Sequence, residues 1–382
     1  MLVGTTLTGC NLGGRRSPTP PAALPAPALQ LAPLRVSPDR ITAITVCTRP
    51  FRAQGPRLDV EQLAGKTIVH NYGHGGSGWS LSWGSSAIAV DKAMASGERQ
   101  IAVLGCGAMG LTSALLLQRS GARVTIYARD LPPNVRSSLA TGLWTPDSRI
   151  CFAQYATPAF RQLWEGMVRG SFATYQTFLG LPASPVEFID LYWVSDSADA
   201  PRRGLADDDA RPRFAELQRE LVPDLMTRSE DFAPGSHSLG QHYLRRNAQM
   251  MFNLSAYTRV LMSDYLSNGG QLQITEFHAP ADLARVRERT VINATGYGSR
   301  ALFNDQSLIP VRGQLARAIP DPKVDYGLIY NGVAFVPRRD GLVFQVIGDN
   351  DYYGVGDETT TPNRGEAELA VNTIAGLYRN PP

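Results

Sequence analysis

The chain has 382 residues, with 37 lysines and arginines against 34 aspartates and glutamates, and a formal net charge of +3. This length exceeds what one hydrophobic core usually organises, so we expect two domains. The small charge, with no cluster of basic and aromatic residues, argues against nucleic acid as a partner. No apolar run reaches the roughly 18 residues that a membrane-spanning helix needs. The four scattered cysteines have neither metal-binding nor disulfide-framework spacing.

The N-terminus has features of an exported protein. The sequence LTGC (7–10) has the form of a bacterial lipoprotein cleavage site and follows a short apolar run without basic residues. A tract rich in proline, alanine and leucine then continues to residue 33, as in a polyproline-like tether. We interpret residues 1–33 as a signal remnant and Pro-rich tether. This predicts the bacterial cell envelope or periplasm, with a possible lipid anchor at Cys10; a cytoplasmic protein with a disordered tail is the alternative.

Two features precede the first helix. An alternating, strand-like run (40–47) ends at TRPFR (48–52), where Arg49 next to a proline suits bidentate binding of a carboxylate; a structural salt bridge is the alternative. A second strand (67–70) leads into HNYGHGGSG (70–78) and then a small-residue helix (85–94). The glycines allow positive φ and close approach, and the helix N-terminus suits an anionic or electron-rich group.

A second glycine-rich turn follows about 30 residues later. A buried strand (99–104) runs into GCGAMG (105–110), then a helix and a strand (123–128). In such a β-α-β unit the GxGxxG motif predicts dinucleotide binding: Gly105 permits the turn, Gly107 admits the pyrophosphate and Gly110 lets helix and strand pack closely. The next two residues, Arg129 and Asp130, leave the dinucleotide open, because the acid favours FAD or NAD and the arginine suits NADP.

The rest of the chain predicts a mixed α/β fold without internal repeats. The strand at 290–298 ends in glycines, which places it beside the two glycine-rich turns at the carboxyl edge of one sheet. The other expected elements are helices at 160–179, 253–266, 281–287 and 364–378, and strands at 186–194, 271–277, 328–337 and 341–347, the last two antiparallel.

Residues 70–84 (HNYGHGGSGWSLSWG) resemble the signature of the D-amino-acid oxidase family. Counterparts of further family segments stand at 48–52, 105–110, 128–132, 142–144, 293–296 and 312–314. The resemblance implies an FAD-binding Rossmann-like domain with an interleaved α+β substrate domain built on an antiparallel sheet. In ordinary members the GxGxxG unit opens the chain and this signature closes it, so the sequence looks circularly permuted, joined at 96–99. The implied domains are 34–150 with 280–305 for FAD, and 151–279 with 306–382 for the substrate.

The resemblance also implies site residues. Arg49 would bind the substrate carboxylate and Tyr330 would add a hydroxyl contact. A second family tyrosine is replaced by Ala334, and Tyr353 is our candidate for its role. The implied FAD contacts are Gly75, Gly76, Ser77, Gly78 and Trp79 at the flavin; Gly105, Gly107, Ala108, Met109 and Gly110 at the pyrophosphate; Arg129 and Asp130 at the adenosine ribose; Ala140, Gly142 and Trp144 at the flavin or ribityl chain; and Thr295 and Gly296.

The implied reaction is FAD-dependent oxidation of a D-amino acid to an imino acid and then a 2-oxo acid. The substrate Cα hydrogen would pass as a hydride to flavin N5, with ammonia and hydrogen peroxide as products after reaction with dioxygen. Four alternatives stay open: a glycine/sarcosine-type amine oxidase, an amino-acid dehydrogenase passing electrons to a quinone, an NADP-dependent dehydrogenase, and a non-enzymatic binding lipoprotein.

Overall fold

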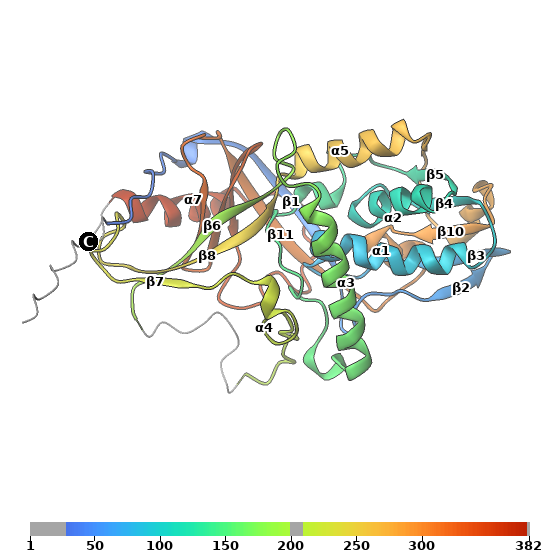
Figure 1. The fold of residues 1–382 in the computed structure, drawn as a ribbon, viewed down its shortest axis with the longest axis horizontal. Helices are drawn as coiled ribbons and strands as arrows, with labels where there is room; N and C mark the ends of the chain where they lie inside the picture. Colours follow the sequence, from blue (N-terminus) through green and yellow to red (C-terminus); the bar gives the residue numbers. More distant parts are fainter. Residues whose placement is uncertain (1–27, 199–208, 380–382) are drawn as a thin grey trace, which may run out of the picture.

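The computed structural model describes residues 28–198 and 209–379, which form two β-sheets side by side (Figure 1). The first sheet is parallel except at its β2 edge. Its four inner strands are mostly apolar and buried on both faces, as parallel strands usually are, whereas the two edge strands are largely exposed. In spatial order it contains β2 (Val60–Leu63), β3 (Lys66–His70), β10 (Thr290–Asn293), β4 (Gln100–Leu104), β5 (Arg123–Ala128) and β9 (Gln271–Ile274).

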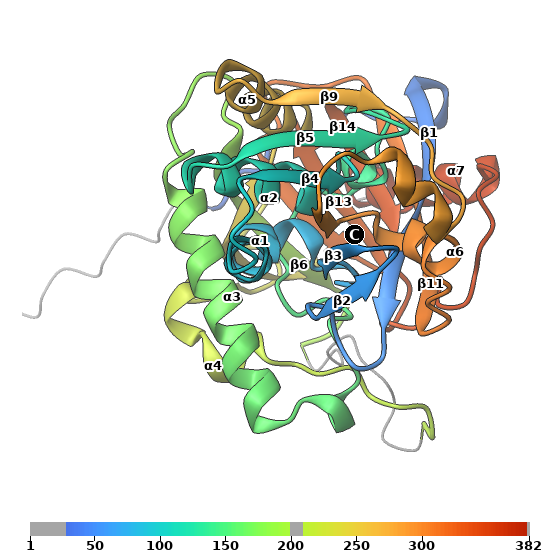
Figure 2. The same cartoon turned by 90° about the vertical axis from the view of Figure 1, so that its right-hand side faces the viewer.

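Helices cover the parallel sheet. Figure 2, turned by 90° from Figure 1, shows α1 and α2 beside β3 and β4. No helix of the described chain has both the length and the apolar character to cross a bilayer. The α-helices are α1 (Gly78–Met94), α2 (Ala108–Arg119), α3 (Pro158–Gln176), α4 (Gln218–Leu221), α5 (Leu254–Ser267), α6 (Ser299–Leu302) and α7 (Arg364–Arg379).

The second sheet is antiparallel except where β12 and β6 run parallel. Helix α7 packs on one face, and the opposite face is turned toward the parallel sheet. In spatial order it contains β1 (Ile41–Arg52), β11 (Leu308–Ala318), β14 (Gly341–Val346), β13 (Val333–Arg338), β12 (Tyr326–Tyr330), β6 (Val186–Ser195), β8 (Tyr243–Phe252) and β7 (Glu230–Phe232).

Some elements differ from the sequence-based expectation. The strand expected at 328–337 is a hairpin of β12 and β13, turned at Asn331 and Gly332, whose φ angles of 43° and 70° suit a two-residue hairpin turn. The helix expected at 281–287 is a short 3-10 helix, Pro280–Arg285. Strands β2, β7 and β8 were not expected.

The expected domain ranges also cross the two sheets. Strand β1 falls in the range assigned to FAD binding, yet it pairs along its length with β11. Strand β9 falls in the range assigned to the substrate, yet it pairs with β5 in the parallel sheet. A period-2 pattern identifies a strand but not the sheet that it joins. Residues 28–33, expected in the tether, pack on the α7 side through buried Leu31, and Cys10 lies outside the described residues.

A buried hydrogen-bond network joins the first glycine-rich turn to both helices. His74 Nε2 lies 2.7 Å from Ser85 Oγ in α1, and that hydroxyl donates to Asn71 Oδ1 at 2.7 Å. The amide nitrogen of Asn71 donates to Ser86 of α1 and Ser113 of α2, both at 3.2 Å. All five side chains are buried. Unpaired polar atoms would be costly there, so the network fixes the turn against α1 and α2.

We expect His74→Gln to flatten the pH dependence of stability. Burial lowers the pKa of His74 to about 3, whereas an unfolded histidine titrates near 6.5. Between these values the unfolded chain binds a proton that the folded chain excludes. The contribution of His74 is therefore complete above pH 6.5 and declines as the pH falls toward 3, by at most about 1.4 kcal/mol per pH unit. Urea unfolding at pH 7, 5.5 and 4.5 measures the slope.

The matched control is His278→Gln, because the His278 side chain is 74% exposed. It should keep the wild-type pH profile. An identical slope in wild type and His74→Gln would contradict the prediction.

Candidate active site

An elongated cleft brings together the two glycine-rich turns, the end of β10 and the end of β1. It therefore draws residues from both sheets. Among the residues expected in the site, the cleft is lined by Arg49, Gly75, Gly76, Gly78, Trp79, Gly105, Gly107, Ala108, Met109, Arg129, Asp130, Ala140, Thr295 and Gly296.

The first turn is held mainly by the protein itself. Gly75 has a φ of 55°, and its N–H donates to Pro50 O at 2.8 Å, while the N–H of Gly76 donates to Ser148 O at 2.9 Å. A Cβ at Gly75 would lie 2.0 Å from Arg149 O. These two amides are therefore already bonded within the protein and are not donors for a ligand. The donors left for a ligand are those opening α1 after Ser77, which caps the helix with no side-chain hydrogen bond.

The second turn presents a helix end to the same cleft. Gly105 has a φ of 97°, and a Cβ at Gly110 would lie 2.0 Å from Gly105 O, which explains the glycine at each position. Helix α2 starts after Gly107, again with no side-chain hydrogen bond from the cap itself. Ser137 Oγ accepts from Ala108 N at 3.1 Å, which brings the loop after β5 against the helix end. The positive end of α2 suits a phosphate.

The charges at the ends of β5 and β9 favour one class of dinucleotide. Arg129 is ion-paired with both Asp130 (Nε–Oδ2 2.9 Å) and Glu276 (Nη1–Oε1 3.1 Å). An arginine already balanced by two carboxylates is a poor receptor for a 2′-phosphate. Two acids next to one cation instead suit ribose hydroxyls. The arrangement favours FAD or NAD over NADP.

Arg49 is held at the other end of the cleft without a carboxylate partner in the described chain. Its guanidinium lies over Gly313, where a Cβ would approach Nη1 to 2.5 Å, and Nη1 donates to Arg312 O at 3.3 Å. The neighbouring Arg312, by contrast, is paired with Glu366 at 2.7 Å. Arg49 thus keeps donors and a positive charge for an anionic ligand.

Neither predicted tyrosine lines the cleft with Arg49. Tyr330 pairs with Val333 across the β12–β13 hairpin and packs in the α7-side core, and its hydroxyl donates to Asp196 at 3.1 Å. Tyr353 donates to Glu366 at 3.2 Å, and burial together with that carboxylate raises the pKa of Tyr353 to about 12. Through Glu366 and Arg312, Tyr353 supports the strand under Arg49 without reaching the cleft.

Four expected cofactor contacts also lie off the cleft. Ser77 donates to Ser148 O at 3.0 Å, and Gly110 packs on the turn at Gly105. Gly142 and Trp144 join the end of β8: Gly142 O accepts from Phe252 N at 2.7 Å. These four residues pack against other parts of the protein and do not line the cleft.

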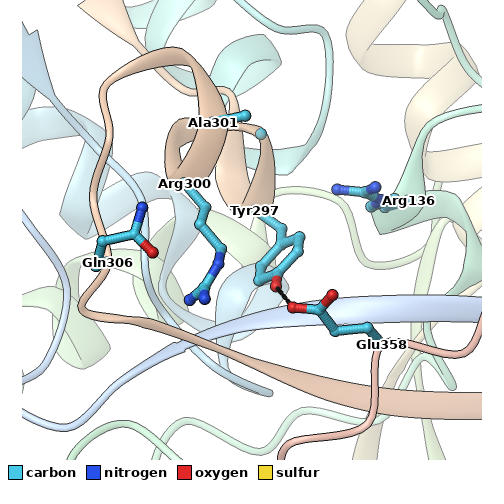
Figure 3. Close-up of a pocket in the computed structure, with 7 residues that line it drawn as sticks. Arg136, Tyr297, Arg300, Ala301, Gln306 and Glu358 are labelled. Carbon is cyan, nitrogen blue, oxygen red and sulfur yellow. Dashed lines mark hydrogen bonds between the residues drawn. The ribbon is translucent and has the colours of Figure 1, made fainter.

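The sequence reasoning missed several cleft residues, among them Glu276, Arg136 and Tyr297. Glu276 and Arg136 carry charge, but no spacing rule marked them. Tyr297 directly follows Gly296 and could have been found as the next residue of its motif. Arg136 and Tyr297 also line a second, outer hollow with Arg300 and Glu358 (Figure 3).

The cleft fits an adenine dinucleotide that carries a flavin. The cleft offers two helix N-termini, two carboxylates at the ends of β5 and β9, and arginines that have no carboxylate partner among the described residues. The side chains of Trp79 and Met109 give that surface apolar area.

Comparisons with known proteins agree with this geometry. The family model described as DAO, FAD dependent oxidoreductase, matches residues 100–380. The chain is 28% identical over 284 residues to a D-amino-acid oxidase of Rubrobacter xylanophilus, covering 72% of this chain and 76% of the relative. It is 27% identical over 291 residues to a D-amino-acid oxidase of Dictyostelium discoideum, covering 72% and 71%.

A solved structure of glycine oxidase from Geobacillus kaustophilus aligns with a TM-score of 0.47 and 14% identity, over 73% of this chain and 78% of that one. A likeness of this size carries no argument about function. The family match spans most of the chain and includes the GxGxxG unit and the strand after it. The protein therefore belongs to the FAD dependent oxidoreductase family, is an enzyme, and uses FAD as its cofactor.

Proposed function

We propose that this enzyme oxidises D-amino acids to 2-oxo acids, releasing ammonia and passing electrons to dioxygen to form hydrogen peroxide. The observation that carries the proposal is Arg49, a cation without a carboxylate partner among the described residues, at the end of an FAD-type cleft. The printed activity of the curated relatives, D-amino-acid oxidase, supports the substrate class.

The residues contribute binding and orientation. Arg49 would hold the α-carboxylate of the substrate in a fixed position, which lowers the entropic part of the barrier. FAD, when bound, supplies the acceptor for the hydride of the substrate carbon. The open end of α1 would place N–H donors and a positive dipole end where negative charge develops on reduction.

Two basic residues that line the cleft lie at or next to the first turn in the described chain: His74, and Arg49, which precedes the Pro50 carbonyl that accepts from Gly75 N. Burial lowers the pKa of His74 to about 3, so the imidazole is neutral at physiological pH. Its Nε2 is also engaged with Ser85. A substrate carboxylate at this end therefore depends on Arg49.

We also propose that the chain is a circular permutant of its family. The family match starts at residue 100, so the segment with Arg49 and the first turn precedes it. Two features support this proposal. The two ends of the described chain lie close together, with Arg379 Nη2 at the end of α7 3.5 Å from Val36 O, so an unpermuted relative could connect them directly. Residues 95–99 only link α1 to β4, so the chain of such a relative could begin and end there.

Replacing Arg49 by alanine should raise KM for a D-amino acid by about thirtyfold or more, since losing a charge-assisted pair costs about 2–5 kcal/mol. FAD should stay bound, because other residues line the rest of the cleft. Steady-state kinetics and the visible flavin spectrum measure the two effects.

Arg123→Ala, an exposed arginine at the start of β5, is the matched control and should behave as wild type. Arg49→Lys should recover part of the loss. Wild-type KM in Arg49→Ala would remove Arg49 from the substrate site.

Anaerobic mixing of the holoenzyme with single amino acids tests the substrate class. We expect D-amino acids to bleach the flavin absorbance and L-amino acids to leave it unchanged. Glycine or sarcosine as the best reductant would favour the amine-oxidase alternative. With air admitted, one peroxide per substrate oxidised is expected; fast flavin reduction with little peroxide would favour a quinone acceptor.

A reordered gene tests the permutation. Residues 98–379, a flexible linker of about twelve residues and residues 28–97 should give a folded protein that binds FAD, since the new ends fall in the exposed link at Gly97. Thermal melting and flavin content measure the outcome. A control cut between Gly107 and Ala108 should abolish FAD binding. If the protein cut at Gly97 were colourless or insoluble, the permutation proposal would be contradicted.

A further inference from the structure

The charges along the cleft leave one arginine unexplained. Three arginines line it: Arg49, Arg129 and Arg136. Arg129 is balanced by two carboxylates, and Arg49 is assigned to the substrate. Arg136 forms no hydrogen bond or ion pair with any residue in 28–198 or 209–379. It makes a cation–π contact with the ring of Tyr297. Arg136 is exposed and has no carboxylate partner in the described chain, so its guanidinium can pair with an anionic group of a ligand in the cleft.

An aromatic support holds Arg136 in place. Its guanidinium carbon lies 5.6 Å from the ring centre of Tyr297, a cation–π distance. The Tyr297 hydroxyl donates to Glu358 at 2.7 Å, so the carboxylate of the outer hollow is engaged with the phenol (Figure 3). Arg300 lies on the other side of Tyr297 and donates to Leu308 O. Arg136 and Tyr297 line both the outer hollow and the cleft, so Tyr297 supports Arg136 where the two meet.

Its position in the chain places Arg136 next to the end of α2. The following residue, Ser137, accepts the N–H of Ala108 through its hydroxyl at 3.1 Å. Ala108 is the first residue of α2, directly after the GxG part of the motif. In a dinucleotide fold this helix end receives the pyrophosphate. The pyrophosphate is also the part of FAD that carries negative charge.

We propose that Arg136 binds the FAD pyrophosphate, adding a charge-assisted contact to the backbone donors of the GxGxxG turn. The inference rests on FAD as the cofactor but not on the substrate proposed above. Arg136 would thereby favour FAD over flavins that lack a pyrophosphate. Tyr297, held by Glu358, would position the Arg136 side chain.

Binding measurements on the apoprotein test this role without any turnover. Dissociation constants are measured for FAD by fluorescence, and for ADP and adenosine by competition, in wild type and Arg136→Gln. We expect FAD and ADP to bind about ten- to a hundredfold more weakly in the variant, as for the loss of a charged hydrogen bond, and adenosine to bind equally. Added NaCl should weaken FAD binding more in wild type than in the variant.

Two further variants separate this role from a structural one. Arg136→Lys keeps the charge and should recover much of the affinity, while Arg300→Gln, on the other side of Tyr297, should bind FAD as wild type. Thermal melting shows whether each variant is folded. Unchanged FAD affinity in Arg136→Gln, or an equal loss for FAD, ADP and adenosine, would overturn the proposal.

The same measurements distinguish this inference from the proposed activity. If wild type binds FAD and shows the Arg136 pattern but no D-amino acid reduces the flavin, the substrate proposal alone fails. If wild-type apoprotein binds no FAD, the cofactor assignment fails and this inference fails with it.

Discussion

The arrangement of the site depends on the buried hydrogen bonds that Asn71 makes to its neighbours. Its side chain accepts from Ser85 and donates to Ser86 and Ser113, so one amide holds α1 and α2 together. Because none of these atoms can exchange a partner for water, the helices cannot slide without leaving polar groups unpaired. The N-terminal ends of both helices are therefore fixed at the same cleft.

Charge then divides that cleft into regions with different ligands. Arg129 with Asp130 and Glu276 forms a cluster with an excess of negative charge that suits hydroxyl groups, while Arg49 and Arg136 remain uncompensated and suit anions. An adenine dinucleotide would supply ribose hydroxyls and a pyrophosphate to these regions, and an amino acid a carboxylate.

The sequence predicted those parts of the site that follow from local rules. Both glycine-rich turns, the β-α-β unit and Arg49 lie where strand and turn patterns placed them. The face to which Tyr330 points could not be read in this way, because in a strand a shift of one residue exchanges the two faces. The turn at Asn331 sets the register that pairs Tyr330 with Val333 on the α7 side. Arg136 was missed because its role depends on Tyr297, 161 positions away.

Contacts distant in sequence also explain why chain order is a weak constraint on this fold. Strand β3 pairs with β10, and Asn293 of β10 donates to the ring of His70 in β3 at 3.1 Å, across 223 positions of sequence. Such contacts need the two segments in one molecule but do not depend on which comes first. The cost of closing the connecting loops grows only slowly with their length. A segment that brings Arg49 and the first turn can therefore precede the GxGxxG unit and still complete the same cleft.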